Sequence, residues 1–353
     1  MTWFTLAYFA VLILGGVVAG MMQRRGPLLL MFVLICISIL AAMVLGPRVL
    51  RTISVAAGGL AAIAGISYVV RESLVHLLPD AAARLMKTAP LTAVFGMLVI
   101  IIYALTAIFA PVIAPYGEAE IVGAAFQPAD EAMLLGGDQL GRDLFSRLVY
   151  GARNTVGIAV VTTAIAFVVG TLTGLIAASM GGWVDQVLGR IVDTLLAIPQ
   201  LIFALLLLTI VGPSIVNLTL VIALLYSPLI FRLARAVAGG IVVMDYIEAA
   251  RLRGEKTWYV IVKEVLPNIT APLAAEFGLR FCFVFLAISA LSFLGLGIQP
   301  PTADWGSMVR ENATLISFGE ITPLIPAAAI ALLTVAVNFV VDWMLHISSG
   351  LKE

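Results

Sequence analysis

The stretch LTAVFGMLVIIIYALTAIFAPVI, residues 91–113, decides the fold class because it has 23 consecutive residues without a charged side chain. A helix needs about 20 apolar residues to cross the roughly 30 Å hydrocarbon core of a bilayer. Together with eight similar segments it makes nine candidate spans, which predicts an all-α, polytopic membrane protein. They are residues 2–21, 27–46, 52–70, 91–113, 155–180, 197–212, 215–235, 272–297 and 321–346.

Composition supports this prediction. The 353 residues are 62% hydrophobic and 11% charged, against about 45–50% and 25% in an average soluble domain. This leaves too little polar surface for a soluble enzyme or a secreted domain. Twenty basic residues balance twenty acidic ones, so no net charge favours nucleic acid as a partner. Two cysteines and two histidines predict neither a disulfide framework nor a metal centre.

Basic residues orient the spans, because they concentrate in cytoplasmic loops. The connection at 236–271 carries four of them, which places it in the cytoplasm, and the acidic loop at 114–154 then faces outside. Arg48 and Arg51 fall on the outside against the rule. We expect two parts, an N-terminal block at residues 1–87 with three spans and a connector, and a six-helix block at 88–353. The four basic residues of the inner connection are Arg251, Arg253, Lys256 and Lys263.

Charged residues within spans are costly and are candidates for function. Glu276 and Arg280 are spaced i,i+4 and are expected to form a structural pair near the cytoplasmic end of their span. Asp342 lies one turn from the inner boundary. Asp185 and Asp193 are expected to flank a solvated turn. The sequence contains no phosphate-binding loop, nucleophile elbow or His-Glu-x-x-His pair, so we expect no catalytic residue and no cofactor in this chain.

The cytoplasmic connection holds the most informative pattern. DYIEAARLRG, residues 245–254, predicts a short helix with acids in its first turn and Gly254 just past its end. An apolar stripe follows and closes at Pro267. Two short helices joined at a glycine would form a compact docking element, but the same residues could lie on lipid headgroups. Physical reasoning leaves both interpretations open. The stripe consists of Trp258, Ile261, Val262 and Val265.

The same residues carry a family resemblance. Glu248, Ala249, Ala250 and Gly254, followed by Leu266 and Pro267, resemble the EAA loop of the permease subunits of ATP-binding-cassette importers. Glu264 stands where that pattern has Ile. In the family this loop is a coupling helix that sits in a groove of a cytoplasmic ATPase. The resemblance therefore implies that Glu248, Ala249, Ala250 and Gly254 perform that coupling here.

Two outer stretches resemble the dipeptide, oligopeptide and nickel branch of these permeases. They are LGGDQLGRDLFSR at 135–147, followed by GAR at 151–153, and LSFLGLGIQPP at 291–301. Gly137 replaces the usual Thr, and Ile288 stands where an acid is common. The motif order is similar to the C-type permease over residues 88–353, and residues 1–87 lie outside it. The matched positions are Asp138, Gly141, Arg142, Asp143, Ser146, Arg147, Pro300, Pro301, Trp305 and Gly306.

The resemblance implies a passive subunit of a peptide importer in the bacterial cytoplasmic (inner) membrane. Its partners would be a second permease, two ATPases that hold ATP and Mg²⁺, an extracytoplasmic substrate-binding protein and membrane lipid. The outer loops would face the binding protein and the second permease. From the residues alone, we favour a structural role in which Arg142, Asp143 and Arg147 pin the outer loop against a helix. The main alternative is a secondary transporter driven by ions or protons, which needs carboxylates near the membrane midplane.

Overall fold

The computed structural model describes residues 63–76, 79–318 and 320–348. The predicted spans at 2–21 and 27–46 lie outside the described residues, as does most of 52–70. Residues 63–76 are helical, and α4 (Asp80–Thr88) follows. The chain divides into two compact units, Met1–Phe95 and Gly96–Glu353. The second unit contains all the motifs discussed above.

Helices form the regular structure of the described residues. Five helical stretches there are long and apolar enough to cross a membrane, and a bent pair of helices would make a sixth. This confirms the all-α, polytopic prediction from residue 91 onward. The five stretches are Leu91–Ile108 (α5), Leu144–Met180 (α7, a π-helical turn and α8), Ile215–Val242 (α11), Thr257–Phe293 (α13 to α14) and Leu324–Ile347 in α16 (Leu324–Ser348). The short α6 (Ala110–Ile113) follows α5.

Helix α7 (Leu144–Gly151) starts the second span eleven residues before the predicted boundary at 155. Asp143 caps it, because its carboxylate accepts a hydrogen bond from the Ser146 N–H at 2.8 Å. The helix continues through a π-helical turn, Ala152–Val156, into α8 (Gly157–Met180). The prediction placed this stretch in a loop because polar side chains such as Arg147 interrupt the apolar run. Those side chains have buried partners, so the boundary at 155 was wrong.

The bent pair corrects a second prediction. Helix α9 (Gly182–Leu196) returns along α8 and α11, and α10 (Gln200–Val211) leaves it at an angle of 87°. Twelve residues of helix span about 18 Å, so α10 does not cross the hydrocarbon core by itself, and the short candidate span at 197–212 is one half of a bent pair. Asp185 and Asp193 lie within α9 rather than beside a turn, and the Asp185 carboxylate forms an ion pair with Arg235 of α11.

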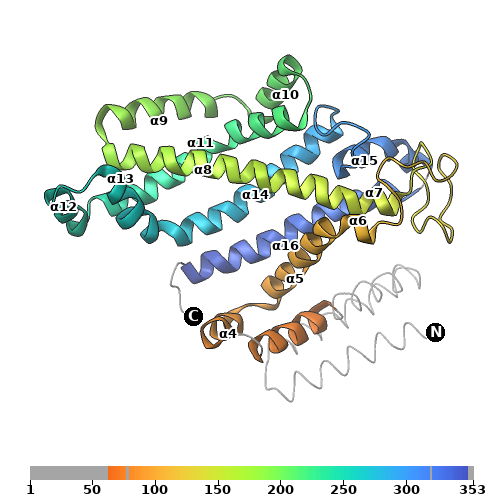
Figure 1. Cartoon of the computed structure of the whole chain (residues 1–353), viewed down its shortest axis with the longest axis horizontal. Coiled ribbons are helices and arrows are strands. Elements are labelled where there is room, and N and C mark those ends of the chain that lie inside the picture. The colour runs from red at the N-terminus through yellow and green to blue at the C-terminus, as the bar shows by residue number, and fades with distance from the viewer. Residues whose placement is uncertain (1–62, 77–78, 319, 349–353) are drawn as a thin grey trace, which may run out of the picture. The chain divides into compact units, whose positions relative to one another are not determined.

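Helices α8 and α11 form the centre of the second unit, with α14 (Thr270–Phe293) beside them and α16 beside α14 (Figure 1). A Cβ atom on Gly170 would lie 2.5 Å from the Ser227 carbonyl oxygen, and one on Gly174 would lie 2.8 Å from that of Phe231. Small residues four apart therefore bring the backbones of α8 and α11 into direct contact. Helix α11 runs seven residues beyond its predicted end at 235.

The last corrections concern α14, which was predicted at 272–297 but ends at Phe293. Helical structure is continuous from Thr257, and it passes Pro267 in a 3-10 turn, Leu266–Ile269. Pro267 stands in the first turn of this 3-10 segment, where a backbone N–H has no partner within the helix, so Pro267 does not close the segment. Glu276 and Arg280 form the predicted ion pair. They lie in the first half of α14, six and ten residues after its start at Thr270.

Candidate coupling surface and outer ion-pair network

The predicted functional residues gather at opposite ends of the α8, α11 and α14 bundle. Helices α12 (Asp245–Leu252) and α13 (Thr257–Tyr259) lie at one end, and α7 with α15 (Trp305–Asn312) lies at the other (Figure 1). We call these the inner end and the outer end, following the sidedness predicted from the basic residues. The two ends are built differently and are described in turn.

Helix α12 has the predicted short form and the predicted glycine end. The Glu255 N–H donates to the Ala250 carbonyl at 3.2 Å, and the Gly254 N–H donates to the Arg251 carbonyl at 2.9 Å. This is the Schellman pattern, in which the residue after the cap adopts a left-handed conformation. Gly254 has φ +83°, and an added Cβ would meet nothing within 4 Å. The backbone conformation alone therefore favours glycine here.

One face of α12 is locked onto the bundle. Ile247 and Ala250 are fully buried in an apolar cluster with Leu175 of α8, Ala234 of α11 and Ile261. The Arg251 guanidinium also donates to the Ser179 carbonyl near the end of α8, at 3.0 Å. Helix α12 is thus packed directly on α8, α11 and the helical stretch that leads into α14. Any displacement of α12 must act on these helices.

The opposite face of α12 is open. Glu248 and Ala249 are exposed, and the large apolar side chains of Leu252, Val243 and Trp258 are 83%, 80% and 59% exposed. We call these five residues the coupling surface. Neighbouring exposed apolar side chains mark contact sites for a protein or a membrane. The predicted apolar stripe is split, since Ile261 and Val265 are buried while Trp258 points outward.

The outer end contains a buried network of four charged side chains. Asp138, Arg142, Arg147 and Glu311 are only 1–6% exposed at their side chains. Arg142 binds Asp138 at 2.6 Å and Glu311 at 3.0 Å, while Arg147 binds Glu311 at 3.2 Å and lies 3.5 Å from Asp138. Two cations and two anions balance, which burial requires. The network joins the outer loop and α7 to α15, as expected for residues that pin the loop against a helix.

The other residues of the first outer stretch shape the same loop. The Asp143 carboxylate accepts hydrogen bonds from both the N–H and the hydroxyl of Ser146, at 2.8 and 2.6 Å. Gly141 has φ +76°, and a Cβ there would lie 2.0 Å from the Gly123 carbonyl oxygen. Gly141 therefore permits a close backbone crossing that no larger residue allows.

The second outer stretch packs against α7 and α14. Trp305 is buried, and its indole N–H donates to the Leu148 carbonyl at 2.9 Å. A Cβ on Gly306 would lie 2.2 Å from the Ser289 carbonyl oxygen. Asp304 caps α15 by accepting from the Ser307 N–H at 2.8 Å. Burial raises the pKa of the Asp304 carboxyl, and the Ser307 hydrogen bond opposes that rise. Pro300 and Pro301 precede this turn and are joined by a cis peptide bond.

Comparison with known proteins identifies the family. Residues 170–349 match the family described as "Binding-protein-dependent transport system inner membrane component". The chain is 36% identical over 254 residues to the "Dipeptide transport system permease protein DppC" of Alkalihalophilus pseudofirmus, covering 71% of this chain and 83% of that protein. The chain belongs to this family of transport permeases.

Two further relatives have similar coverage. The permease is 36% identical over 246 residues to the "Peptide transport system permease protein SapC" of Escherichia coli O6:H1, which covers 68% of this chain and 83% of that protein. It is 34% identical over 259 residues to the "Probable D,D-dipeptide transport system permease protein DdpC" of Escherichia coli K12, covering 73% and 87%. The family match contains α12 and the coupling surface, whereas the outer stretch at 135–147 precedes it.

Sequence reasoning about the permease missed the partners of the outer motifs. Glu311 completes the charge network, and Glu118 accepts from the Asn154 amide and from the Ala303 N–H, both at 2.9 Å. The Thr155 hydroxyl donates to Asp304 at 2.8 Å. Arg142 and Glu311 are 169 residues apart in the chain, so local spacing carries no sign of their contact. Charge balance was the signal that could have indicated these partners, because buried arginines require nearby acids.

Proposed function

We propose that this permease is the C-type membrane subunit of an ATP-binding-cassette importer for dipeptides, oligopeptides or similar small solutes in the bacterial inner membrane. It would form the translocation path with a second permease. Two cytoplasmic ATPases would hold ATP and Mg²⁺, and an extracytoplasmic binding protein would deliver the substrate. The names of the relatives above support the peptide substrate. The two-faced construction of α12 is the structural observation that carries the proposal.

The coupling step follows from that construction. The coupling surface offers an anion at Glu248 and apolar side chains at Val243, Leu252 and Trp258 to a groove on an ATPase. The buried face is packed on α8 and α11. When the two ATPases close, a docked α12 would move with them and carry α8 and α11 as a rigid body. The permease itself performs no chemistry in this scheme.

Two observations favour ATPase docking over the alternatives. A loop that merely lies on headgroups presents basic residues alone beside its apolar face, whereas this connection exposes the acids Asp245 and Glu248 as well as Arg253 and Lys256. An ion-coupled transporter would need a carboxylate within a span, such as Glu276, but this carboxylate is already paired with Arg280 on its own helix. A paired carboxylate is costly to protonate, because protonation leaves the arginine without a counter-charge.

The test is a double variant, Glu248→Ala with Gly254→Pro, in the assembled transporter in proteoliposomes. We expect loss of ATPase copurification and of ATP-driven dipeptide uptake, since the variant removes the anion and the turn of the coupling surface. Lys263→Ala is the matched control, because Lys263 is exposed on the same connection but lies outside that surface. Uptake driven by a proton gradient without any ATPase would overturn the proposal.

A further inference from the structure

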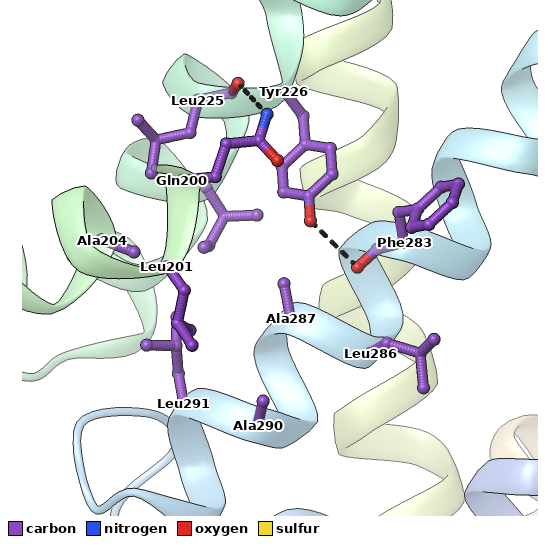
Figure 2. A pocket seen from close by; sticks show the side chains of 11 residues that line it. Gln200, Leu201, Ala204, Leu225, Tyr226, Phe283, Leu286, Ala287, Ala290 and Leu291 are labelled. Carbon is purple, nitrogen blue, oxygen red and sulfur yellow. Dashed lines mark hydrogen bonds between the residues drawn. The ribbon is translucent and has the colours of Figure 1, made fainter. Parts of the chain in front are cut away.

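A cavity of about 290 Å³ lies between α10, α11 and α14. Figure 2 shows Gln200 and Tyr226 together at one end of it, with Ala287 and Ala290 of α14 along one side. Ala204 of α10 contributes another small side chain to the lining. Small side chains on two facing helices leave the space that larger residues would fill. The cavity has the size and the largely apolar lining of a site for one apolar side chain.

Two polar groups at the cavity keep unused hydrogen-bonding capacity. The Gln200 amide nitrogen donates to the Leu225 carbonyl at 3.2 Å, and the Tyr226 hydroxyl donates to the Phe283 carbonyl at 3.3 Å (Figure 2). These bonds use donor hydrogens and leave the amide oxygen of Gln200 and the lone pairs of the Tyr226 oxygen as acceptors. Both can accept hydrogen bonds from N–H groups of a bound molecule.

One face of α14 leads from the cavity to a charged pair. Glu276, Arg280, Phe283, Ala287 and Ala290 follow the 4, 3, 4, 3 spacing of a single helix face, and the last three line the cavity. Arg280 binds Glu276 through Nε, and its guanidinium carbon lies 5.7 Å from the centre of the Phe283 ring. The remaining guanidinium N–H groups of Arg280 can therefore bind an anion without breaking the pair.

We propose that this cavity and Arg280 form a contact site for the transported peptide within the membrane. The cavity takes an apolar side chain, Gln200 and Tyr226 accept from peptide N–H groups, and Arg280 binds the terminal carboxylate. Glu276 keeps the empty site electrically neutral, so a cation is held in the membrane without a net charge. The proposal rests on the proposed function and adds the residues that recognise the substrate.

The first test leaves the permease unchanged. Alanyl-photoleucine, a dipeptide with a photoreactive side chain, is added to the assembled wild-type transporter and irradiated, and adducts are mapped by mass spectrometry. We expect adducts on α10, α11 or α14 among the residues that line the cavity, and competition by unlabelled Ala-Leu. Adducts confined to other helices would overturn the site. If the wild-type transporter takes up no dipeptide, the proposed function itself is wrong. Uptake with adducts only elsewhere would instead contradict this site alone.

The second test fills the cavity. Ala287→Leu should lower uptake of Ala-Phe about tenfold relative to Ala-Ala, because a pocket that loses a few methylenes of room discriminates by about that factor. The Ala-Ala rate in the same variant corrects for assembly and expression. Ala274→Leu is the control, since Ala274 is exposed on the same helix away from the cavity. An unchanged Ala-Phe to Ala-Ala ratio in Ala287→Leu would overturn the side-chain site.

The third test concerns the charged pair. Glu276→Gln with Arg280→Gln removes both charges together, so no unpaired charge is left in the membrane. We expect loss of dipeptide uptake in transporters that still copurify with the ATPases, and partial recovery when only Arg280→Lys is made. Uptake by the double variant at the wild-type rate would show that the pair is structural and would overturn the carboxylate contact.

Discussion

The two ends of the helix bundle differ in whether their charged and large apolar side chains are buried or exposed. At the outer end, the four side chains of the ion-pair network are buried, and Trp305 is covered. At the inner end, Glu248 is exposed together with Leu252 and Trp258. A buried, fully paired network holds its elements in one arrangement, because any displacement uncovers a charge without a partner. An exposed apolar surface, by contrast, gains free energy when a partner covers it.

This difference in burial shows where the motif residues act. In the outer loop they act inside the protein, so any contact with a binding protein must come from exposed neighbours such as Leu140, which is 52% exposed. In α12 the motif residues divide, with Ala250 buried and Glu248 exposed. Substitutions at the outer end should therefore affect folding, while those on the coupling surface should affect assembly.

Glu311→Ala is expected to have the largest effect. It leaves Arg142 and Arg147 sharing Asp138, with Glu118 as a further anion near Arg147, and breaking a buried pair costs about 3–5 kcal/mol. The measurement is the free energy of unfolding of the purified permease in detergent. Glu131→Ala, an exposed acid of the same loop, is the control and should change little. Equal effects of the two substitutions would contradict the idea that burial makes the outer end rigid.

A comparison of Ile247→Ala with Leu252→Ala separates the roles of the buried and the exposed face of α12. Ile247 is fully buried, and truncating a buried isoleucine to alanine costs about 2–5 kcal/mol. Leu252 is 83% exposed, so its truncation should change stability by less than about 0.5 kcal/mol. The second readout is copurification with the ATPases, which Leu252→Ala should weaken although the permease stays folded. Normal copurification of Leu252→Ala would remove Leu252 from the coupling surface.

Gly170→Ala tests the connection between the two ends. The added methyl group would meet the backbone of α11, and overpacking of this kind costs about 1–3 kcal/mol. Gly157→Ala on the same helix is the control, because a Cβ there meets nothing within 4 Å. We expect Gly157→Ala to be neutral or slightly stabilising in thermal unfolding. A loss of stability as large as that of Gly170→Ala would argue against the close contact of α8 and α11.

Gly254→Ala should have the smallest effect among the substitutions that we expect to destabilise the permease. There is room for the methyl group, so the cost is that of a left-handed backbone, about 1–2 kcal/mol for a residue with a Cβ. Gly254→Asn should cost less, since asparagine tolerates this conformation better. Thermal unfolding of the two variants side by side measures the difference. If the two variants were equally unstable, some factor other than backbone conformation would set the requirement.

The sequence pattern correctly predicted the elements that are determined by residues close together in the chain. The ends of α12, the glycine at position 254 and the Glu276–Arg280 pair all depend on residues within five positions of one another. The failures arise where distant residues or a local change of helix type override the pattern. The predicted span began too late, at 155, because Arg147 interrupts the apolar run and its partner Glu311 belongs to α15. Pro267 was predicted to stop a helix that a 3-10 turn carries past it. The Asp185–Arg235 ion pair between α9 and α11 joins residues fifty positions apart, which local spacing does not reveal.

The backbone contact between α8 and α11 has a mechanical consequence. Two helices in direct backbone contact have no flexible side chains between them at Gly170 and Gly174, so we expect them to move together as a single stiff lever. Helix α8 has 24 residues and is about 36 Å long, and α12 is fastened at its inner tip by Arg251 and Ile247. A tilt of about 5° at that tip would move the outer tip by about 3 Å. A small displacement of α12 on one side of the membrane would therefore move the outer tip of α8 on the other side by about an atom's diameter.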